Sequence, residues 1–414
     1  MHRKHSRAFA AALALCGSAA VHAEGNPWTL AFQETLNHDS NVFRAPRDAA
    51  DRPTDYISTT SVIGSLNQPI GRETLKVNGE FDINRFRFQH QLDSMAHSLS
   101  SELDWSTVGN VSGEAGFSNS RQLYRYNTTQ ATQVVETLNI ETENQGFFRA
   151  RVGVVTDLTL GAEANLYRRA FSNTAYRFND QLRRDAAVSA TWRSNPDLSF
   201  TAKVRRAIGE YPDSGNQVLH RPDDKFDRND FNLGVQYAPS GESSLSITGG
   251  KASESHSLDT FRTNELWTSS ANWKWQPTGH LLLQLGYTRD NDTGANDTTV
   301  FIFPAVDTDA RLRSTWNGSM TFLATGKVRL TAQGSYSNRV LAGTQTVFGN
   351  TTEFRGSDRL YTASVSAQWQ ASRAVSLSCT AARERRATAG DPPPGITYAY
   401  GAVVLSCSGQ FALN

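Results

Sequence analysis

The chain has 414 residues, 20% of them charged, and its formal net charge at pH 7 is +1. So small a charge excludes a strongly basic nucleic-acid-binding protein, and we expect no nucleic acid among its partners. The mean hydropathy of -0.48 is too polar for a protein built from membrane-spanning helices. It is ordinary for a barrel that has a wet interior.

The first residues have the organisation of a secretory signal peptide. Arg3, Lys4 and Arg7 precede an apolar run over residues 8–20, and small residues at Val21 and Ala23 suit cleavage by a signal peptidase. We therefore predict residues 1–23 as a signal peptide and residues 24–414 as a single outer-membrane β-barrel domain. Three positive charges belong to the signal, so the net charge falls from +1 to −2 in the mature chain.

A lipid anchor at Cys16 is the alternative to cleavage after Ala23. That processing needs a small residue just before the cysteine, where the chain has Leu15. The apolar run is too short to cross a bilayer as a helix, and no later segment approaches the ~20 apolar residues that a spanning helix needs.

The rest of the chain repeats one unit: an alternating strand, a short turn, a second alternating strand and a longer polar loop. Alternation at period two is typical of strands with one apolar and one polar face. The pattern predicts an all-β, antiparallel up-and-down transmembrane barrel of about 18 strands; 16 also fits, and residues 126–157 are the least clear. The expected strands are 27–38, 55–67, 72–89, 94–108, 111–125, 133–152, 157–170, 180–194, 197–210, 226–238, 243–257, 262–276, 280–290, 308–323, 327–340, 358–370, 374–387 and 397–413.

Turns and loops alternate along the chain. Short turns such as Pro239-Ser240-Gly241-Glu242 contrast with longer stretches near residues 39–54, 211–225, 291–307, 341–357 and 388–396. In outer-membrane barrels the turns are periplasmic and the loops are outside, and an even strand number returns both termini to the periplasm. We therefore expect the outer membrane of a Gram-negative cell, with both termini periplasmic.

Aromatic residues stand at both expected membrane borders, as they do in barrel girdles. Those before the short turns are Trp105, Trp192, Tyr237, Trp275, Phe322 and Trp369, and those near the loops are Tyr124, Tyr167, Trp267, Tyr287, Tyr336 and Tyr361.

A soluble sandwich or propeller is the alternative fold, but the faces opposite the apolar ones are too polar to build a dry core. On a barrel they line the lumen instead. The candidates for lining the passage are Arg205, Arg311, Arg313, Arg329, Arg339, Glu80 and Asp82.

The sequence contains no signature of an enzyme, so we expect no catalytic residue, no metal site and no cofactor. The histidines occur in no nucleophile-bearing motif. Asp223, Asp224, Asp227 and Asp230 could hold a cation in a loop, although a solvated loop face is the simpler interpretation.

The mature chain keeps two cysteines, Cys379 and Cys407, whose midpoint is Pro393 in a proline-rich loop. If the two flanking strands pair about that loop, the cysteines lie opposite each other, on the lipid-facing side. A cross-strand disulfide can then form in an exported protein; the alternative is two free thiols.

One local motif follows the first expected strand: Asp39, Asn41 and Arg44 in an Asp-x-Asn-x-x-Arg pattern. With the Asp55-Tyr56 start of the next strand, the Ile70-Gly71-Arg72 turn and the terminal cysteine hairpin, it resembles the β-barrel porin 2 group. Within that group the chain is most similar to the EpsL-type outer-membrane proteins of exopolysaccharide biosynthesis operons. A departure is that Phe411 is followed by three more residues, whereas barrels usually end on an aromatic residue.

The resemblance implies a conduit for exopolysaccharide export. Without it, the same polar lining fits a general or solute-specific diffusion porin, or a barrel closed by its loops. The expected partners are outer-membrane lipid, a polysaccharide or another hydrophilic solute, the barrel assembly machinery and a periplasmic export component.

Overall fold

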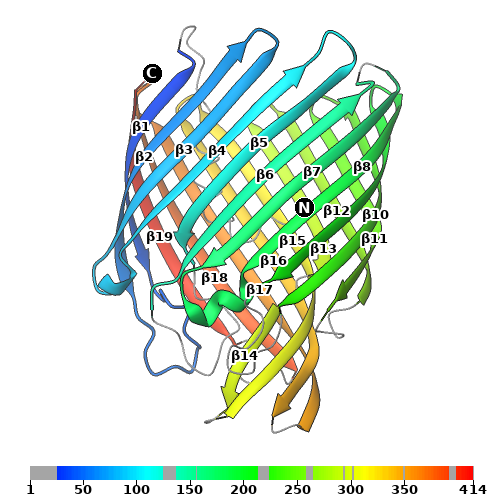
Figure 1. Cartoon of the computed structure of the whole chain (residues 1–414). Helices are drawn as coiled ribbons and strands as arrows, with labels where there is room; N and C mark the ends of the chain where they lie inside the picture. The colour runs from blue at the N-terminus through cyan, green and yellow to red at the C-terminus, as the bar shows by residue number, and fades with distance from the viewer. Residues whose placement is uncertain are drawn as a thin grey trace.

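A computed structural model of the chain describes residues 26–124, 137–154, 156–212, 223–257, 264–291, 294–300, 303–347, 350–390 and 398–413. Within these residues the strands form one antiparallel sheet that closes into a barrel, because β1 pairs with β2 on one side and with β19 on the other (Figure 1). The elements are β1 (Trp28–Asp39), β2 (Asp55–Ile70), β3 (Glu73–Phe86), η1 (His90–Leu92), β4 (Ser94–Ser106), β5 (Val111–Leu123), β6 (Ile140–Val152), β7 (Leu158–Phe171), η2 (Thr174–Asn179), β8 (Gln181–Asn195), β9 (Leu198–Tyr211), β10 (Asp224–Ser240), β11 (Ser243–His256), β12 (Asn264–Thr278), β13 (Leu281–Asn291), β14 (Gly294–Val300), β15 (Phe303–Thr325), β16 (Val328–Val347), β17 (Asn350–Gln370), β18 (Val375–Gly390) and β19 (Tyr400–Leu413).

The barrel wall has 18 strands, as the sequence predicts. The short strand β14 is not a separate strand of the barrel wall. It pairs with the first part of β15, and β13 pairs with the rest of β15. The signal peptide predicted over residues 1–23 lies outside the described residues. So do residues 133–136 of the strand expected over 133–152; residues 137–139 are described but precede β6, which begins at Ile140.

Two segments expected to be loops, 291–307 and 341–357, instead contain strand. The hairpin of β14 with β15 and the hairpin of β16 with β17 continue past the barrel wall, and Figure 1 shows the β14 hairpin projecting beyond the rim. Both segments are polar, which made them resemble loops, yet they contain many threonines and some valines, which favour extended backbone.

The two rims of the barrel differ. At the turn rim the connections are short, such as residues 71–72 between β2 and β3 and residues 326–327 between β15 and β16. Gly71 has φ +66°, which glycine adopts at no steric cost. β1 begins and β19 ends at this same rim, where Leu30 pairs with Leu413. The opposite rim, which we call the loop rim, carries longer connections such as residues 40–54.

The outer face of the barrel is apolar. Leu36 is 63% exposed and Val188 is 62% exposed. A continuous surface of such aliphatic side chains is unfavourable in water. All six aromatics predicted near the turns share this face, as the pairing of Trp192 with Leu158 and the stacking of Trp192 on Phe200 at 5.8 Å illustrate.

Two of the loop-side girdle aromatics were wrongly placed by the sequence. Tyr167 lies on the inner face, where its hydroxyl donates to Glu143 at 2.7 Å, and Tyr124 packs edge-on against inward-facing Phe171 at 4.9 Å. Position near a loop suggested the girdle, but parity within the strand decides the face. Tyr124, one residue past the end of β5, has the same inward parity as Glu114. The other four, Trp267, Tyr287, Tyr336 and Tyr361, face outward.

A small apolar cluster lies inside the barrel at the loop rim. It consists of Phe43, Phe86, Leu92 and Phe171, contributed by the loop after β1, by β3, by η1 and by β7. The cluster fastens these segments to the wall. Among the described residues, no helix is long and apolar enough to cross a bilayer.

Candidate functional site: the polar lumen

Hydroxyl side chains line much of the inner face and bond to one another across neighbouring strands. Because each is satisfied within the wall, the lining offers many weak hydrogen-bonding groups rather than one deep site. The oxygen–oxygen distances are 2.9 Å for Thr191–Thr201, 3.0 Å for Thr315–Ser337, 2.6 Å for Ser335–Thr362 and 2.8 Å for Ser378–Ser408.

Charged residues toward the turn rim pair across strands within the lumen. Lys76 lies 2.5 Å from Asp104 and 3.3 Å from Glu102, and these three side chains are more than one third exposed. Such exposed pairs contribute little to stability, so their charges remain available to a solute. Similar pairs join Glu114 to Arg149 at 2.9 Å and to Arg151 at 2.7 Å, and Lys203 to Glu163 at 2.7 Å.

Toward the loop rim the inner face holds a buried network centred on Arg228. Its guanidinium lies 2.8 Å from Asp230, 3.3 Å from Glu254 and 2.8 Å from Asp290, and Arg205 adds a second contact to Asp230 at 2.7 Å. The network joins β9, β10, β11 and β13. A buried guanidinium requires such partners, and the multiple carboxylates use several of its donors.

His256 extends this network. Its two ring nitrogens lie 2.7 Å from Asp224 and 2.9 Å from Glu254, and its ring stacks on Phe226 at 5.8 Å. The imidazolium form is the one that can donate to both carboxylates. In the described part of the chain, no group of three or more His, Cys, Asp or Glu residues is arranged to hold a metal ion.

Sequence reasoning missed this network. It grouped the aspartates of residues 223–230 as one loop cluster, but Asp227 and Asp230 lie in β10 on opposite faces. Asp227 pairs with Arg206 outside at 2.5 Å, whereas Asp230 faces inward. A cation site shared by these carboxylates is therefore wrong, and so is the solvated loop face, because Asp224 and Asp230 are buried in β10. The inward parity of Asp224, Arg228 and Asp230 was the signal that could have separated them.

The predicted lumen-lining arginines have different surroundings. Arg205 is bound to Asp230, and Arg339 forms a buried ion pair with Asp358. Arg329, near the turn rim, donates to Gln368 at 3.5 Å.

Two arginines complete the predicted set. Arg313 stands in register with Asp290 and Arg339 on the inner face. For Arg311 the strand is described but the side chain is outside the described residues.

Glu80 and Asp82 stand side by side on the inner face of β3, two residues apart. Asp82 accepts a hydrogen bond from Ser61 at 2.6 Å. Within the described residues neither carboxylate has a cationic partner. These two are therefore the acidic residues of the predicted lining, and the described wall places no cation against either of them.

The Asp39, Asn41 and Arg44 motif lies at the loop end of the seam where β1 meets β19. The Arg44 side chain is 2% exposed and lies 2.8 Å from Asp39 and 3.3 Å from Glu384 of β18. Asn41 binds both the N–H and the carbonyl of Ala45, at 2.8 and 3.0 Å. The motif thus ties the loop after β1 to the last hairpin of the chain.

The backbone of Arg44 depends on these contacts. Its φ of 54° lies in the left-handed region, which residues other than glycine rarely adopt. Burial by itself lowers the pKa of the guanidinium, but Asp39 and Glu384 outweigh it and raise that pKa above its ordinary value. Arg44 is therefore held fully charged, and its role in the structure is to clamp the seam.

Asp55, at the start of β2, organises the next loop. It is completely buried, and its carboxylate accepts hydrogen bonds from the backbone N–H groups of Arg87, Phe88 and Gln89 at 3.0, 3.1 and 2.8 Å. The residues that carry the family resemblance thus include two aspartates that anchor loops at one rim.

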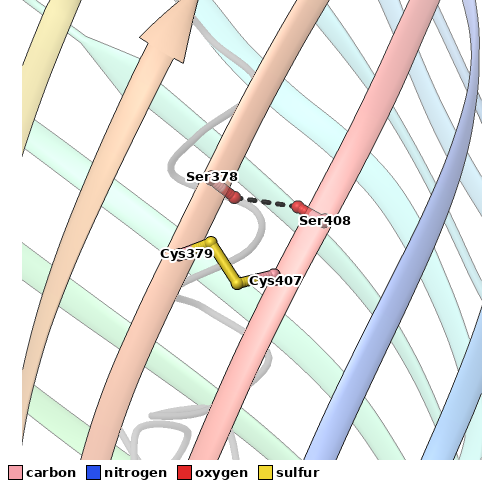
Figure 2. Close-up of a disulfide and its surroundings, with 4 residues drawn as sticks. All are labelled: Ser378, Cys379, Cys407 and Ser408. Carbon is pink, nitrogen blue, oxygen red and sulfur yellow. Dashed lines mark hydrogen bonds between the residues drawn. A yellow bond between two sulfur atoms is a disulfide. The ribbon is translucent and has the colours of Figure 1, made fainter.

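The terminal hairpin contains a disulfide between Cys379 and Cys407, which stand directly opposite each other on β18 and β19 (Figure 2). The neighbouring pair, Ser378 and Ser408, bonds on the inner face at 2.8 Å. Since faces alternate, the disulfide lies on the outer face, and it staples the two strands that precede the closing seam.

Removing this disulfide should destabilise the barrel without changing its conductance. The bond closes a loop with a sequence separation of 28 residues, for which chain entropy gives about 3.5 kcal/mol. We expect the double variant Cys379→Ser/Cys407→Ser to unfold at a lower temperature in unboiled electrophoresis. Two free thiols in the mass spectrum of the mature wild-type protein would contradict the staple.

No family model matches the chain, and no curated protein sequence matches it. Among solved structures it is similar to OprD from Pseudomonas aeruginosa, with 10% identity and a TM-score of 0.45 over 94% of this chain and 96% of that one. It is also similar to the outer membrane protein OpdK from Pseudomonas aeruginosa, with 10% identity and a TM-score of 0.43 over 93% and 99%. The FrpB iron transporter from Neisseria meningitidis gives 8% identity and 0.45 over 94% and 82%. At these values the likeness assigns neither activity nor substrate.

Proposed function

We propose that the chain is a channel of the Gram-negative outer membrane that passes hydrophilic material through its lumen without catalysis or cofactor. The observation that carries this proposal is that the closed wall has an apolar outer face and a polar inner face. Lipid is the solvent that suits a continuous apolar exterior, and closure leaves no unpaired strand edge within it. The lining of hydroxyls, amides and charges suits a hydrated solute.

The proposed orientation places the turn rim and both termini in the periplasm, with the loop rim outside. Insertion would require the barrel assembly machinery. A periplasmic export component would then meet the turn rim.

We propose exopolysaccharide as the exported material. The resemblance carried by Asp39, Asn41 and Arg44 names this class of substrate. The cross-strand hydroxyl pairs support it, because a long hydrated chain needs many weak partners and no deep well if it is to keep moving. This is the finer part of the proposal.

A diffusion porin is the second candidate, and Glu80 with Asp82 favours it. Two uncompensated carboxylates in the lumen attract cations, which is the type of lining that selects small ions and charged solutes. A polysaccharide conduit has no need of that selectivity.

Deleting the gene and recording single channels separates these candidates. For an export conduit we expect secreted polysaccharide to fall to background in the deletion strain and to return when the wild-type gene is restored. The purified barrel should conduct ions in a planar bilayer. Normal polysaccharide together with an open channel would favour the porin, and the absence of any conductance would contradict both.

A further inference from the structure

The outer face of the barrel carries a basic patch where its apolar surface ends near the loop rim. Arg121 on β5, Arg168 on β7 and Arg184 on β8 are all exposed, and all have the outward parity of their strands. Within the described ranges none of the three forms an ion pair. Three cations without an ion pair therefore occupy one sector of the exterior, where Glu210 on the outer face of β9 is a diagonal neighbour of Arg184.

The patch lies at the border of the apolar surface. On β5 the exposed residue Phe117 lies four positions from Arg121 toward the turn rim, and Leu166, 59% exposed, lies two positions from Arg168. The exterior at the opposite rim of the same sector ends in Trp105, Leu158 and Trp192 instead. The basic charge is thus confined to one border.

A ladder of polar side chains completes the patch. His97 Nε2 donates to the side-chain oxygen Oδ1 of Asn119 at 2.7 Å, and Asn119 Nδ2 donates to Asn144 Oδ1 at 2.8 Å. Asn144 is in register with Arg168, so the ladder leads from β4 to the arginine on β7. Amide donors beside guanidinium groups are the chemistry that recognises phosphate oxygens.

The spacing suits a lipid headgroup that carries more than one phosphate. Arg121 and Arg168 are two strands apart, about 10 Å across the sheet. Arg168 and Arg184 are on adjacent strands but two positions out of direct register, a diagonal separation of about 7–8 Å. Flexible arginine side chains can bridge such distances to phosphates on one headgroup.

We propose that Arg121, Arg168 and Arg184, with Asn119 and Asn144, bind the phosphates of an anionic glycolipid in the membrane leaflet at the loop rim. The inference rests on the proposed location in the outer membrane. The apolar surface below the patch would receive the acyl chains. Charge complementarity selects this occupant, because a zwitterionic lipid would leave the three cations without net compensation.

A second cluster occupies the same border on β17 and β18. Arg359, Arg383 and Arg385 are exposed on the outer face, in register with Ala387, Val403 and Tyr361. The two clusters must therefore be removed separately in any test.

The test counts lipids on the full mature barrel by native mass spectrometry in a mild detergent. The probes are bis-phosphorylated lipid A, phosphatidylcholine and inorganic phosphate. We expect lipid A alone to be retained. The variant Arg121→Gln/Arg168→Gln/Arg184→Gln should retain one fewer lipid A molecule. The affinity of this site for lipid A should fall about fivefold for each cation removed and about a hundredfold in all.

The matched control removes the same charge from the turn rim, in Arg72→Gln/Lys327→Gln/Arg373→Gln, and should leave retention unchanged. Equal retention of lipid A by wild type and the first variant would overturn the inference, as would equal retention of lipid A and phosphatidylcholine. Displacement by millimolar inorganic phosphate would show a free-anion site and would also overturn it. Folding of each variant is checked by unboiled electrophoresis.

The same preparations keep the two proposals distinguishable. A barrel that conducts in planar bilayers yet retains no lipid A contradicts only the headgroup site. A barrel that does not insert or conduct contradicts the proposed channel itself.

Discussion

Replacing Arg44 by alanine is expected to destabilise the barrel by about 3–5 kcal/mol, the usual cost of breaking a buried ion pair. The change strands the buried carboxylate of Asp39 and removes the contact to Glu384 of β18. It also removes the side-chain contacts that help to hold the backbone of residue 44 at φ 54°. Since β1 and β19 close the barrel, we expect the loss to loosen the seam at the loop rim.

The measurement is the temperature at which the folded form disappears in unboiled electrophoresis, supported by urea unfolding in detergent. Arg47→Ala is the matched control, because Arg47 is exposed in the same loop. The double variant Arg44→Ala/Asp39→Ala should cost less than the sum of the two single changes, since the two residues share one interaction. Additive losses, or an Arg44→Ala barrel as stable as wild type, would refute the clamp.

Neutralising the acidic pair in the lumen is expected to reduce the preference of the channel for cations. At about 5 Å in water one charge contributes about 0.8 kcal/mol, a factor of about four in the local ion population. Averaged over a wide lumen, we expect Glu80→Gln/Asp82→Asn to lower the cation-to-anion permeability ratio by about two- to fourfold. The measurement is the reversal potential across a salt gradient.

The position of the charge should matter as much as its removal. Glu265 lies on the outer face of β12 beside Lys251 at 2.5 Å, so Glu265→Gln removes one carboxylate without altering the lining. We expect its reversal potential to equal that of the wild type. The effect of the Glu80 and Asp82 changes should shrink at high salt, because ions screen the charges. An unchanged reversal potential at low salt would show that the pair does not face the permeation path.

Alternation along the strands predicted the fold because the two faces of the wall suit different environments, an apolar one outside and an aqueous one inside. Residues such as Leu75, Val77 and Phe81 against Lys76, Glu80 and Asp82 in β3 assign the two faces directly. The girdle prediction for Tyr124 and Tyr167 rested on nearness to a loop rather than on parity, so both were misplaced. Polar composition does not exclude a strand that runs past the wall, so the segments around residues 300 and 347 were interpreted as loops.

The sequence by itself determined the closed barrel, its two faces and the direct opposition of Cys379 and Cys407, because these depend on local period and on symmetry about one loop. Only the tertiary structure decided which charges are compensated. Arg228 meets Glu254 and Asp290 on other strands, and Arg44 meets Glu384 across the closing seam. The physical reason is that alternation specifies a face but not the register, which emerges only when neighbouring strands pair.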